Sequence, residues 1–294
     1  MGFRLLKILI FLFFIQSCFC PKAQAIKIGL VDSADSVTIG ASKIAYLYKP
    51  GVEKPLCQLE AMKPYIFKAS GKSISVQINN KYHDLSLTRL VITPQGSGFV
   101  SAKKRWYRGE FIIMNRDGHL VIINDLPIEE YILGVVPSEM PSKWNTEALK
   151  AQAIAARSYA IANRGKRASK GYDLNDTPED QAYGGASAET AETNRAVAAT
   201  KGIVVTYDKK VIPAYYSASA GGQTINSGAV WNQDLPFLRS VPSFDEGISK
   251  NGHGVGMSQH GANNLASKGY NAYQILTHYY NNVKFGRLDP SWAL

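Results

Sequence analysis

Short runs of apolar residues alternate with polar breaks through the first third of the chain. The runs are rich in Ile, Val, Tyr and Thr, and residues such as Gly, Pro, Asn and Asp separate them. β-branched and aromatic residues between turn-forming residues are typical of strands. The pattern therefore predicts a small antiparallel β-rich region over residues 26–100, with strands at 26–31, 36–41, 43–49, 65–69, 73–79 and 87–93.

The pattern changes after residue 100, where strands give way to helices. Two apolar segments meet at Asp117-Gly118, a pair that favours a tight hairpin turn. An apolar run with charged edges then enters a turn at residues 137–141, and an Ala-rich helix follows with Asn145 as its N-cap. Further helices are predicted at residues 188–200 and after Asn271. The fold class is therefore α+β: a β-rich N-terminal part, then a mixed α/β domain over residues 101–290 with a central Ala-rich helix.

The first 25 residues have the pattern of an export signal. Arg4 and Lys7 precede a short apolar stretch, and residues 23–25 (Ala-Gln-Ala) form a small-residue cleavage site. The apolar stretch is short for a membrane span. Cys18 lies in a loose lipobox, so a lipid anchor at this cysteine is the alternative and the one predicted contact with a membrane. Both interpretations predict an exported protein of the periplasm or cell envelope.

Composition narrows the possible partners. The chain has a formal charge of +10, and removal of residues 1–25 takes away three cations and no acid, which leaves +7. The sequence has no basic cluster interleaved with aromatic residues, so it does not indicate a nucleic-acid-binding protein. A moderate positive charge suits an anionic envelope polymer or membrane surface, and it also serves solubility. Cys57 would remain as the single cysteine, which excludes an intramolecular disulfide.

Glu139 is the strongest candidate for catalytic chemistry. Pro137 and Pro141 restrict the backbone on either side of it, and apolar Met140 and Trp144 follow closely in the sequence. Burial of a carboxyl group in rigid, apolar surroundings raises its pKa, because the charged form is disfavoured there. Such a group suits general acid catalysis at neutral pH.

A basic strip is predicted beside this acid. Lys150 and Arg157 are about two helical turns apart, so they project from the same face of the Ala-rich helix. They are candidates for groups that orient Glu139 or a ligand. The alternative is that all three charges are ordinary solvated groups, since charged residues on helices are usually exposed.

Two long blocks of sequence carry a resemblance to a known family. The first is LPIEEYILGVVPSEMP at residues 126–141, followed by EALKAQAIAARSYA at residues 147–160. The second is NGHGVGMSQHGANNLASKGYNAYQILTHYY at residues 251–280. Over residues 105–285 the chain resembles a short form of the SpoIID/LytB family, which is named for stage II sporulation protein D and the LytB amidase enhancer.

The resemblance implies a lytic transglycosylase of peptidoglycan glycan strands. Such an enzyme cleaves the bond between MurNAc and GlcNAc, here in peptide-stripped strands, and leaves 1,6-anhydro-MurNAc ends. Glu139 would be the general acid and base, and Lys150 and Arg157 would orient it or the glycan. The alternative is a non-catalytic peptidoglycan-binding enhancer of a cell-wall amidase; an N-acetylmuramoyl-L-alanine amidase is the implied protein partner. Further supporting positions are Gln181, Tyr183, Ser219, His253, Ser258 and Gln259.

The loop at residues 165–185 departs from the family pattern. Many relatives carry a cluster of Cys and His there, and some of them bind zinc with it. This chain has Asn175, Glu179 and Asp180 at the corresponding positions. Oxygen ligands alone do not make a tetrahedral zinc site, so neither a metal nor a cofactor is predicted. The expected consequence is a looser loop that hydrogen bonds hold in place.

The second block contains a glycine-rich loop at residues 252–261, which lets groups point into a cleft. His253 is its candidate for positioning substrate or tuning Glu139, because imidazole titrates near neutral pH. Ser258 does not fit the G-x-S-x-G elbow of serine hydrolases. His260 is predicted to pack. Ser219, which precedes a Gly-Gly pair, marks either a place where a glycan approaches the backbone or a simple turn.

Overall fold

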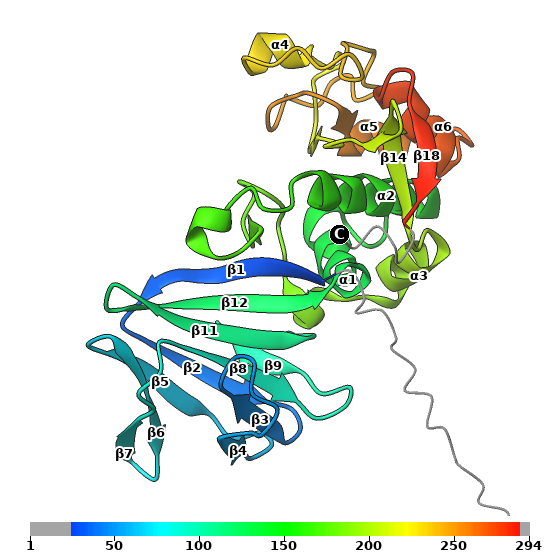
Figure 1. Ribbon diagram of the computed structural model, residues 1–294. Coiled ribbons are helices and arrows are strands. Elements are labelled where there is room, and N and C mark those ends of the chain that lie inside the picture. The colour runs from blue at the N-terminus through cyan, green and yellow to red at the C-terminus, as the bar shows by residue number, and fades with distance from the viewer. Residues whose placement is uncertain (1–24, 289–294) are drawn as a thin grey trace, which may run out of the picture.

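The structure, a computed structural model, describes residues 25–288. The predicted signal peptide and the Cys18 anchor fall on residues 1–25 and, apart from Ala25, lie outside the described residues. Strands dominate the N-terminal part of the chain and helices follow, which confirms the predicted α+β fold (Figure 1). No helix between residues 25 and 288 combines the length and the apolar character that crossing a membrane requires.

Two large sheets make up the β-rich part. The first has the strand order β13-β1-β12-β11-β8-β3-β4 and the second has the order β10-β9-β2-β5-β6-β7. Neighbouring strands run antiparallel, except that β1 and β13 are parallel. The strands are β1 (Ala25–Ala34), β2 (Ser36–Ala41), β3 (Ala45–Tyr48), β4 (Cys57–Leu59), β5 (Tyr65–Ser70), β6 (Ser73–Ile78), β7 (Lys81–Asp84), β8 (Arg89–Pro94), β9 (Val100–Ala102), β10 (Arg105–Tyr107), β11 (Glu110–Arg116), β12 (His119–Pro127) and β13 (Leu174–Asn175).

The first sheet crosses the expected boundary at residue 100. β1 pairs with β12, and β8 pairs with β11, so strands from both sides of that position share one hydrogen-bonded sheet. The predicted hairpin between β11 and β12 is confirmed. Its turn residues Asp117 and Gly118 have φ values of 54° and 87°, as a tight hairpin turn with two left-handed residues requires.

Helix α2 is the centre of the helical part, with α1 and α3 on one side and α5, α6 and β14 on the other (Figure 1). Asn145 caps α2 and Asn271 caps α6, as predicted, and the structure adds a full capping box at Asn271. The remaining elements are α1 (Ile128–Glu139), α2 (Thr146–Ala162), α3 (Ala191–Ala199), α4 (Ser227–Val230), α5 (Gln259–Ser267), α6 (Ala272–Tyr279), the 3₁₀ turns η1 (Ala168–Lys170) and η2 (Gly185–Ala188), and strands β14 (Ile203–Tyr207), β15 (Lys210–Val211), β16 (Tyr216–Ser217), β17 (Met257–Ser258) and β18 (Lys284–Arg287).

The expected turn at residues 137–141 is wrong, because helix α1 continues through Pro137 to Glu139. A proline past the first turn removes one backbone hydrogen bond from a helix and crowds the carbonyl four residues earlier, so other interactions have to offset this cost. Tyr131, Ile132 and Val135 form a buried face of α1, so packing against the core favours the helix. The helix ends at Met140, whose backbone is extended at φ −131° and ψ 139°.

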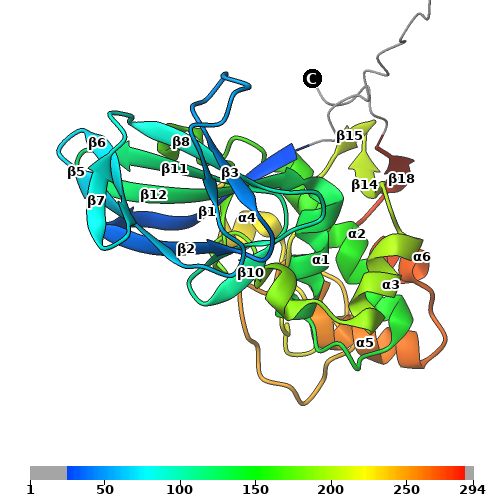
Figure 2. The ribbon, with the colours of Figure 1, turned by 90° about the horizontal axis from the view of Figure 1, so that it is seen from below.

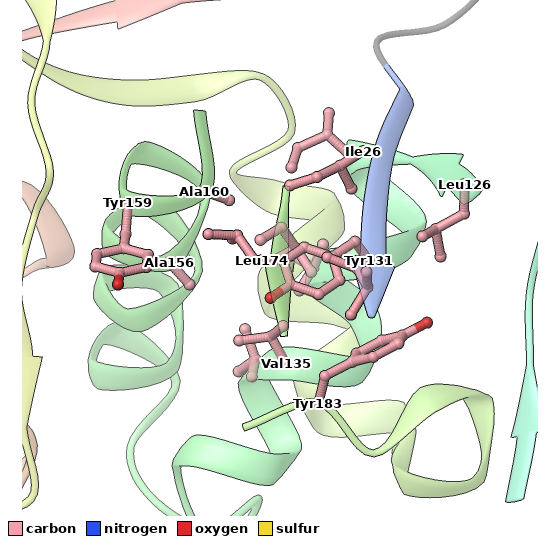
Figure 3. Packing of buried hydrophobic residues seen from close by; sticks show 14 of the residues in the cluster. Ile26, Leu126, Tyr131, Val135, Ala156, Tyr159, Ala160, Leu174 and Tyr183 are labelled. Atoms are coloured by element: carbon pink, nitrogen blue, oxygen red, sulfur yellow. The ribbon is translucent and has the colours of Figure 1, made fainter. Parts of the chain in front are cut away.

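A hydrophobic core lies where α1 and α2 meet the first sheet. Gly134 of α1 is required there, because a Cβ at this position would lie 2.6 Å from the ring of Tyr183. Small Ala side chains on α2 allow a similarly close approach. Figure 3 shows side chains from α1, α2, β1 and β13 gathered in this core, including Tyr131, Val135, Ala156, Ala160, Ile26 and Leu174.

Candidate active site

Glu139 is the last residue of α1, and its side chain is half-buried. The Ala182 N–H donates to Oε1 at 2.6 Å, and Nε2 of Gln259 lies 3.5 Å from Oε2. Burial raises the pKa of the Glu139 carboxyl above its ordinary value, although hydrogen bonds from Ala182, Gln259 and Tyr216 partly oppose the rise. The site therefore favours the protonated acid and still offers three donors to the anion.

A cavity of about 600 Å³ opens in front of Glu139. Aromatic rings form much of its wall; the rings of Tyr215 and Trp231 are 4.5 Å apart, and Tyr159 also lines it. Further lining residues come from the loop before Ala182, from β16 and from the start of the glycine-rich loop. Aromatic rings bind the apolar faces of sugars and leave their hydroxyls to polar neighbours. The cavity therefore suits acid catalysis on a carbohydrate.

Two of the predicted glutamines organise this carboxyl group. Gln259 lines the cavity and contacts Glu139 directly. Gln181 is fully buried, and its Nε2 donates at 2.9 Å to the hydroxyl of Tyr216, which in turn hydrogen-bonds to Glu139. Neither Tyr216 nor Gln152, whose Oε1 lies 3.4 Å from Nε2 of Gln259, was identified from the sequence. Their contacts join chain segments far apart in the sequence, so no local pattern reveals them.

Arg157 and Lys150 do not form the predicted basic strip. The Arg157 guanidinium is fully buried, and two of its nitrogens each lie 2.8 Å from a carboxylate oxygen of Glu129. Lys150 instead pairs with Glu147 on its own helix at 2.7 Å. Among residues 25–288 no ion pair to Glu139 is found, so neither cation contacts the candidate acid.

Three other predicted residues lie behind the cavity instead of lining it. The Tyr183 hydroxyl donates to Asn124 Oδ1 at 2.9 Å. Ser219 Oγ donates to the Ser249 carbonyl at 2.7 Å, beside an isolated antiparallel β-bridge between Ser219 and Asn251. Ser258 Oγ accepts from the Gly261 N–H at 3.1 Å and so caps α5. Each side chain is buried and holds a wall of the site in place.

His253 lines the cavity, but the expectation that it titrates near neutral pH is wrong. Burial lowers its pKa to about 4, and its Nδ1 accepts the Val255 N–H at 3.0 Å. A neutral imidazole therefore packs beside Trp231, with ring centres 5.1 Å apart. His260 packs on the Trp144 ring at 4.8 Å, as predicted.

Gly256 shows why the loop that carries His253 needs glycine. It has a φ of 74°, and a Cβ there would lie 2.1 Å from the carbonyl oxygen of Tyr215. No larger residue fits this close approach of two backbone segments.

Asp245 is a second buried carboxylate that the sequence did not reveal. It accepts hydrogen bonds from the N–H groups of Ala220 and Gly222 and from the hydroxyls of Ser243 and Ser258. Burial alone raises the pKa of this carboxyl, but the four donors outweigh it and hold the pKa at about 2. Asp245 therefore joins the segments that carry the walls of the cavity.

The loop at residues 165–185 is held by more than the hydrogen bonds expected. The buried side chain of Asp180 pairs with Lys166 at 2.6 Å and with Arg167 at 2.5 Å, and it accepts the Asn175 N–H at 2.8 Å. Arg167 also reaches Glu179 at 3.0 Å. Within residues 25–288, no group of three or more His, Cys, Asp or Glu side chains is placed to hold a metal ion.

The chain is similar to one protein-family model and to several named proteins. Residues 116–207 match the family model described as SpoIID, stage II sporulation protein. Stage II sporulation protein D of Bacillus amyloliquefaciens is 28% identical over 262 residues, which cover 57% of this chain and 76% of that protein. The Bacillus subtilis protein of the same name is 38% identical over 136 residues, covering 41% and 40%. The amidase enhancer of B. subtilis is 46% identical over 105 residues, covering 36% and 14%.

Proposed function

Because the chain belongs to the SpoIID/LytB family, we propose that it is a lytic transglycosylase of peptidoglycan glycan strands, with Glu139 as general acid and base. It acts on the bond between MurNAc and GlcNAc in strands whose stem peptides have been removed. One observation carries the proposal. The Glu139 carboxyl is half-buried, has a raised pKa and faces a cavity with aromatic walls.

The reaction uses one carboxyl group in two protonation states. Protonated Glu139 donates its proton to the glycosidic oxygen as the bond from that oxygen to the anomeric carbon breaks. The muramoyl 6-hydroxyl then bonds to the anomeric carbon, and the carboxylate takes the hydroxyl proton. The product ends in a 1,6-anhydro ring, no water is consumed, and Glu139 is protonated again.

The surroundings of Glu139 support both of these states. Burial favours the protonated acid before the first proton transfer. The Ala182 N–H at 2.6 Å, with the side chains of Gln259 and Tyr216, stabilises the anion that exists between the two transfers. These donors are fixed by the fold, so little reorganisation is needed when the charge develops.

A hydrolase with two carboxylates has less support. Such an enzyme needs a second carboxylate free to activate water or attack the sugar. Glu179 and Asp180 also line the cavity, but Arg167 pairs with both of them. Lys166 adds a further ion pair to Asp180. Both acids therefore hold the loop in place, and Glu139 remains as the acid of this cavity that forms no ion pair among residues 25–288.

The proposal is tested by mass spectrometry of peptide-stripped glycan strands after incubation with the protein. Glu139→Gln keeps the shape of the side chain but removes the proton, so we expect the yield of anhydro ends to fall by about a thousandfold. Glu179→Gln is the matched control, because it removes a carboxylate from the same cavity and should retain cleavage. Anhydro ends from Glu139→Gln at the native rate would overturn the assignment, and reducing ends would indicate a hydrolase.

The second candidate function is that of a peptidoglycan-binding enhancer of an amidase. The similarity to the amidase enhancer, which is 46% identical over 105 residues, favours it. This candidate predicts glycan binding with neither kind of cleaved end. Both functions make an amidase that removes stem peptides the natural partner, and both need the protein outside the cytoplasm, as the N-terminal signal pattern predicts.

A further inference from the structure

A second cavity of about 590 Å³ lies next to the one that holds Glu139. The two cavities share Ser138, Pro178 and Ala182, and two of these adjoin the acid: Ser138 precedes it in the chain and Ala182 donates to it. A strand that is cut at Glu139 has to extend in both directions from the scissile bond. The second cavity is therefore in position to hold the part that the first cavity does not.

The β-rich part of the chain supplies cations to this second cavity. Lys103 and Arg105 line it. Lys103 is the first residue of the two-residue turn between β9 and β10, and Arg105 follows that turn directly. Lys103 and Lys104 have φ values of 53° and 61°, which the tight turn requires. β10 also packs on η2, so the turn is fixed against the helical part (Figure 2).

The two cations differ in what they already bind. Nζ of Lys103 lies 2.7 Å from Asp176 Oδ2 and 3.0 Å from the Leu30 carbonyl, so its charge is compensated. Arg105 is exposed, and among residues 25–288 it forms no ion pair. The cavity lining therefore holds two cations and one carboxylate, with the guanidinium of Arg105 in surplus.

We propose that the second cavity binds a carboxylate group of the glycan strand through Arg105. This inference rests on the proposed function, since it concerns the same strand beside the same scissile bond. Guanidinium binds carboxylate through two parallel hydrogen bonds, which fixes orientation as well as position. A muramoyl residue carries such a group on its lactyl ether when the peptide is absent. When the stem peptide is present, the lactyl carboxyl is an amide and the carboxylates belong to the peptide.

Calorimetric binding to three kinds of strand tests this subsite. The probes are peptide-stripped strands, strands with stem peptides, and neutral N-acetylglucosamine oligomers. Arg105→Gln should weaken binding of a carboxylate-bearing strand by about tenfold and leave the neutral oligomer within about twofold. A loss confined to stripped strands identifies the lactyl carboxylate, whereas a loss confined to intact strands identifies a peptide carboxylate.

Lys104→Gln is the matched control, because it removes one positive charge from the same turn and lines neither cavity. Equal losses in Arg105→Gln and Lys104→Gln, or a loss for neutral oligomers as large as for charged strands, would overturn the subsite. All binding is measured in proteins that also carry Glu139→Gln, so no cleavage is needed. If native protein forms no anhydro ends but Arg105-dependent binding persists, the enzymatic proposal fails and the subsite stands.

Discussion

The regions around Glu139 and Asp245 each surround one carboxyl group, and they shift its pKa in opposite directions. Glu139 has one short hydrogen bond, from the Ala182 N–H at 2.6 Å, and a long contact to Gln259 at 3.5 Å. Asp245 is fully buried and is surrounded by two N–H groups and two hydroxyls that all donate to it. The pKa is raised for Glu139 and lowered to about 2 for Asp245.

The comparison shows that donor geometry, more than depth of burial, decides what each acid can do. Burial raises the pKa in both regions, but only Asp245 has enough donors to reverse the effect. Its permanent charge ties Ser258, the cap of α5, to the turn at Ala220. Because Gln259 follows Ser258, the fixed acid helps to position a side chain that contacts the titrating one.

The largest effect on stability is expected for Asp245→Asn. At about pH 7 we expect the free energy of unfolding to fall by about 3 kcal/mol, because four buried donors lose an anionic acceptor. The folded pKa of this carboxyl, about 2, lies below its ordinary 3.8. Its charge therefore stabilises the native protein fully above pH 3.8, and this contribution is lost as the pH falls through 2. Urea unfolding across this range should show the two proteins converging.

Asp234→Asn is the control for that experiment. Asp234 pairs with Arg239 at the surface, and its side chain is 59% exposed. A surface ion pair of this kind contributes less than about 1 kcal/mol to the free energy of unfolding, and this contribution depends little on how the core is packed. If both variants lost equal stability, or if the Asp245→Asn deficit did not shrink in acid, the two acidic regions would not differ in the way described.

Short-range signals in the sequence were sufficient for the caps and tight turns. The N-caps Asn145 and Asn271 and the hairpin turn at Asp117 each depend on a few neighbouring residues, and all three are confirmed. The sequence also indicated a raised pKa for Glu139, although the rigid setting of this acid comes from the end of a helix and not from a proline-bounded turn.

Long-range contacts account for what the sequence did not reveal. The apolar run of α1 has β-branched residues that also suit a strand, and only packing on the core decides for the helix. Once α1 is a helix, Glu129 faces Arg157, and the predicted basic strip disappears. Ser243 is two residues from Asp245, but the other three donors, Ala220, Gly222 and Ser258, lie 13 to 25 positions away, so no local pattern indicates the whole set.

A smaller effect, on pH dependence, is expected for Tyr216→Phe. The Tyr216 hydroxyl lowers the pKa of Glu139 by hydrogen bonding to its charged form. Removal of the hydroxyl should therefore raise that pKa further. Because the first step needs the protonated acid, cleavage falls as the pH rises through the pKa, and this alkaline limb should move to higher pH in the variant. The pH profile of kcat on stripped strands measures the shift.

Tyr215→Phe provides the comparison, because Tyr215 lines the same cavity without a hydrogen bond to Glu139 among the described residues. Its alkaline limb should stay in place, even if KM changes through weaker sugar binding. A shift of both profiles by the same amount would assign the effect to general changes in the cavity. A shift of the Tyr216→Phe limb to lower pH would contradict the role of this hydroxyl.

The smallest effect is expected for Lys150→Gln, which tests whether the Glu139 region truly lacks a cation. Lys150 pairs with Glu147 one turn away, and both side chains are partly exposed. Such a pair stabilises a helix by about 0.5 kcal/mol or less, so the urea midpoint should barely move. Cleavage should stay within about twofold of native, since the ammonium group makes no contact with Glu139. A loss of kcat with unchanged stability would mean that Lys150 reaches the bound strand, and the two acidic regions would then differ in charge partners as well as in donors.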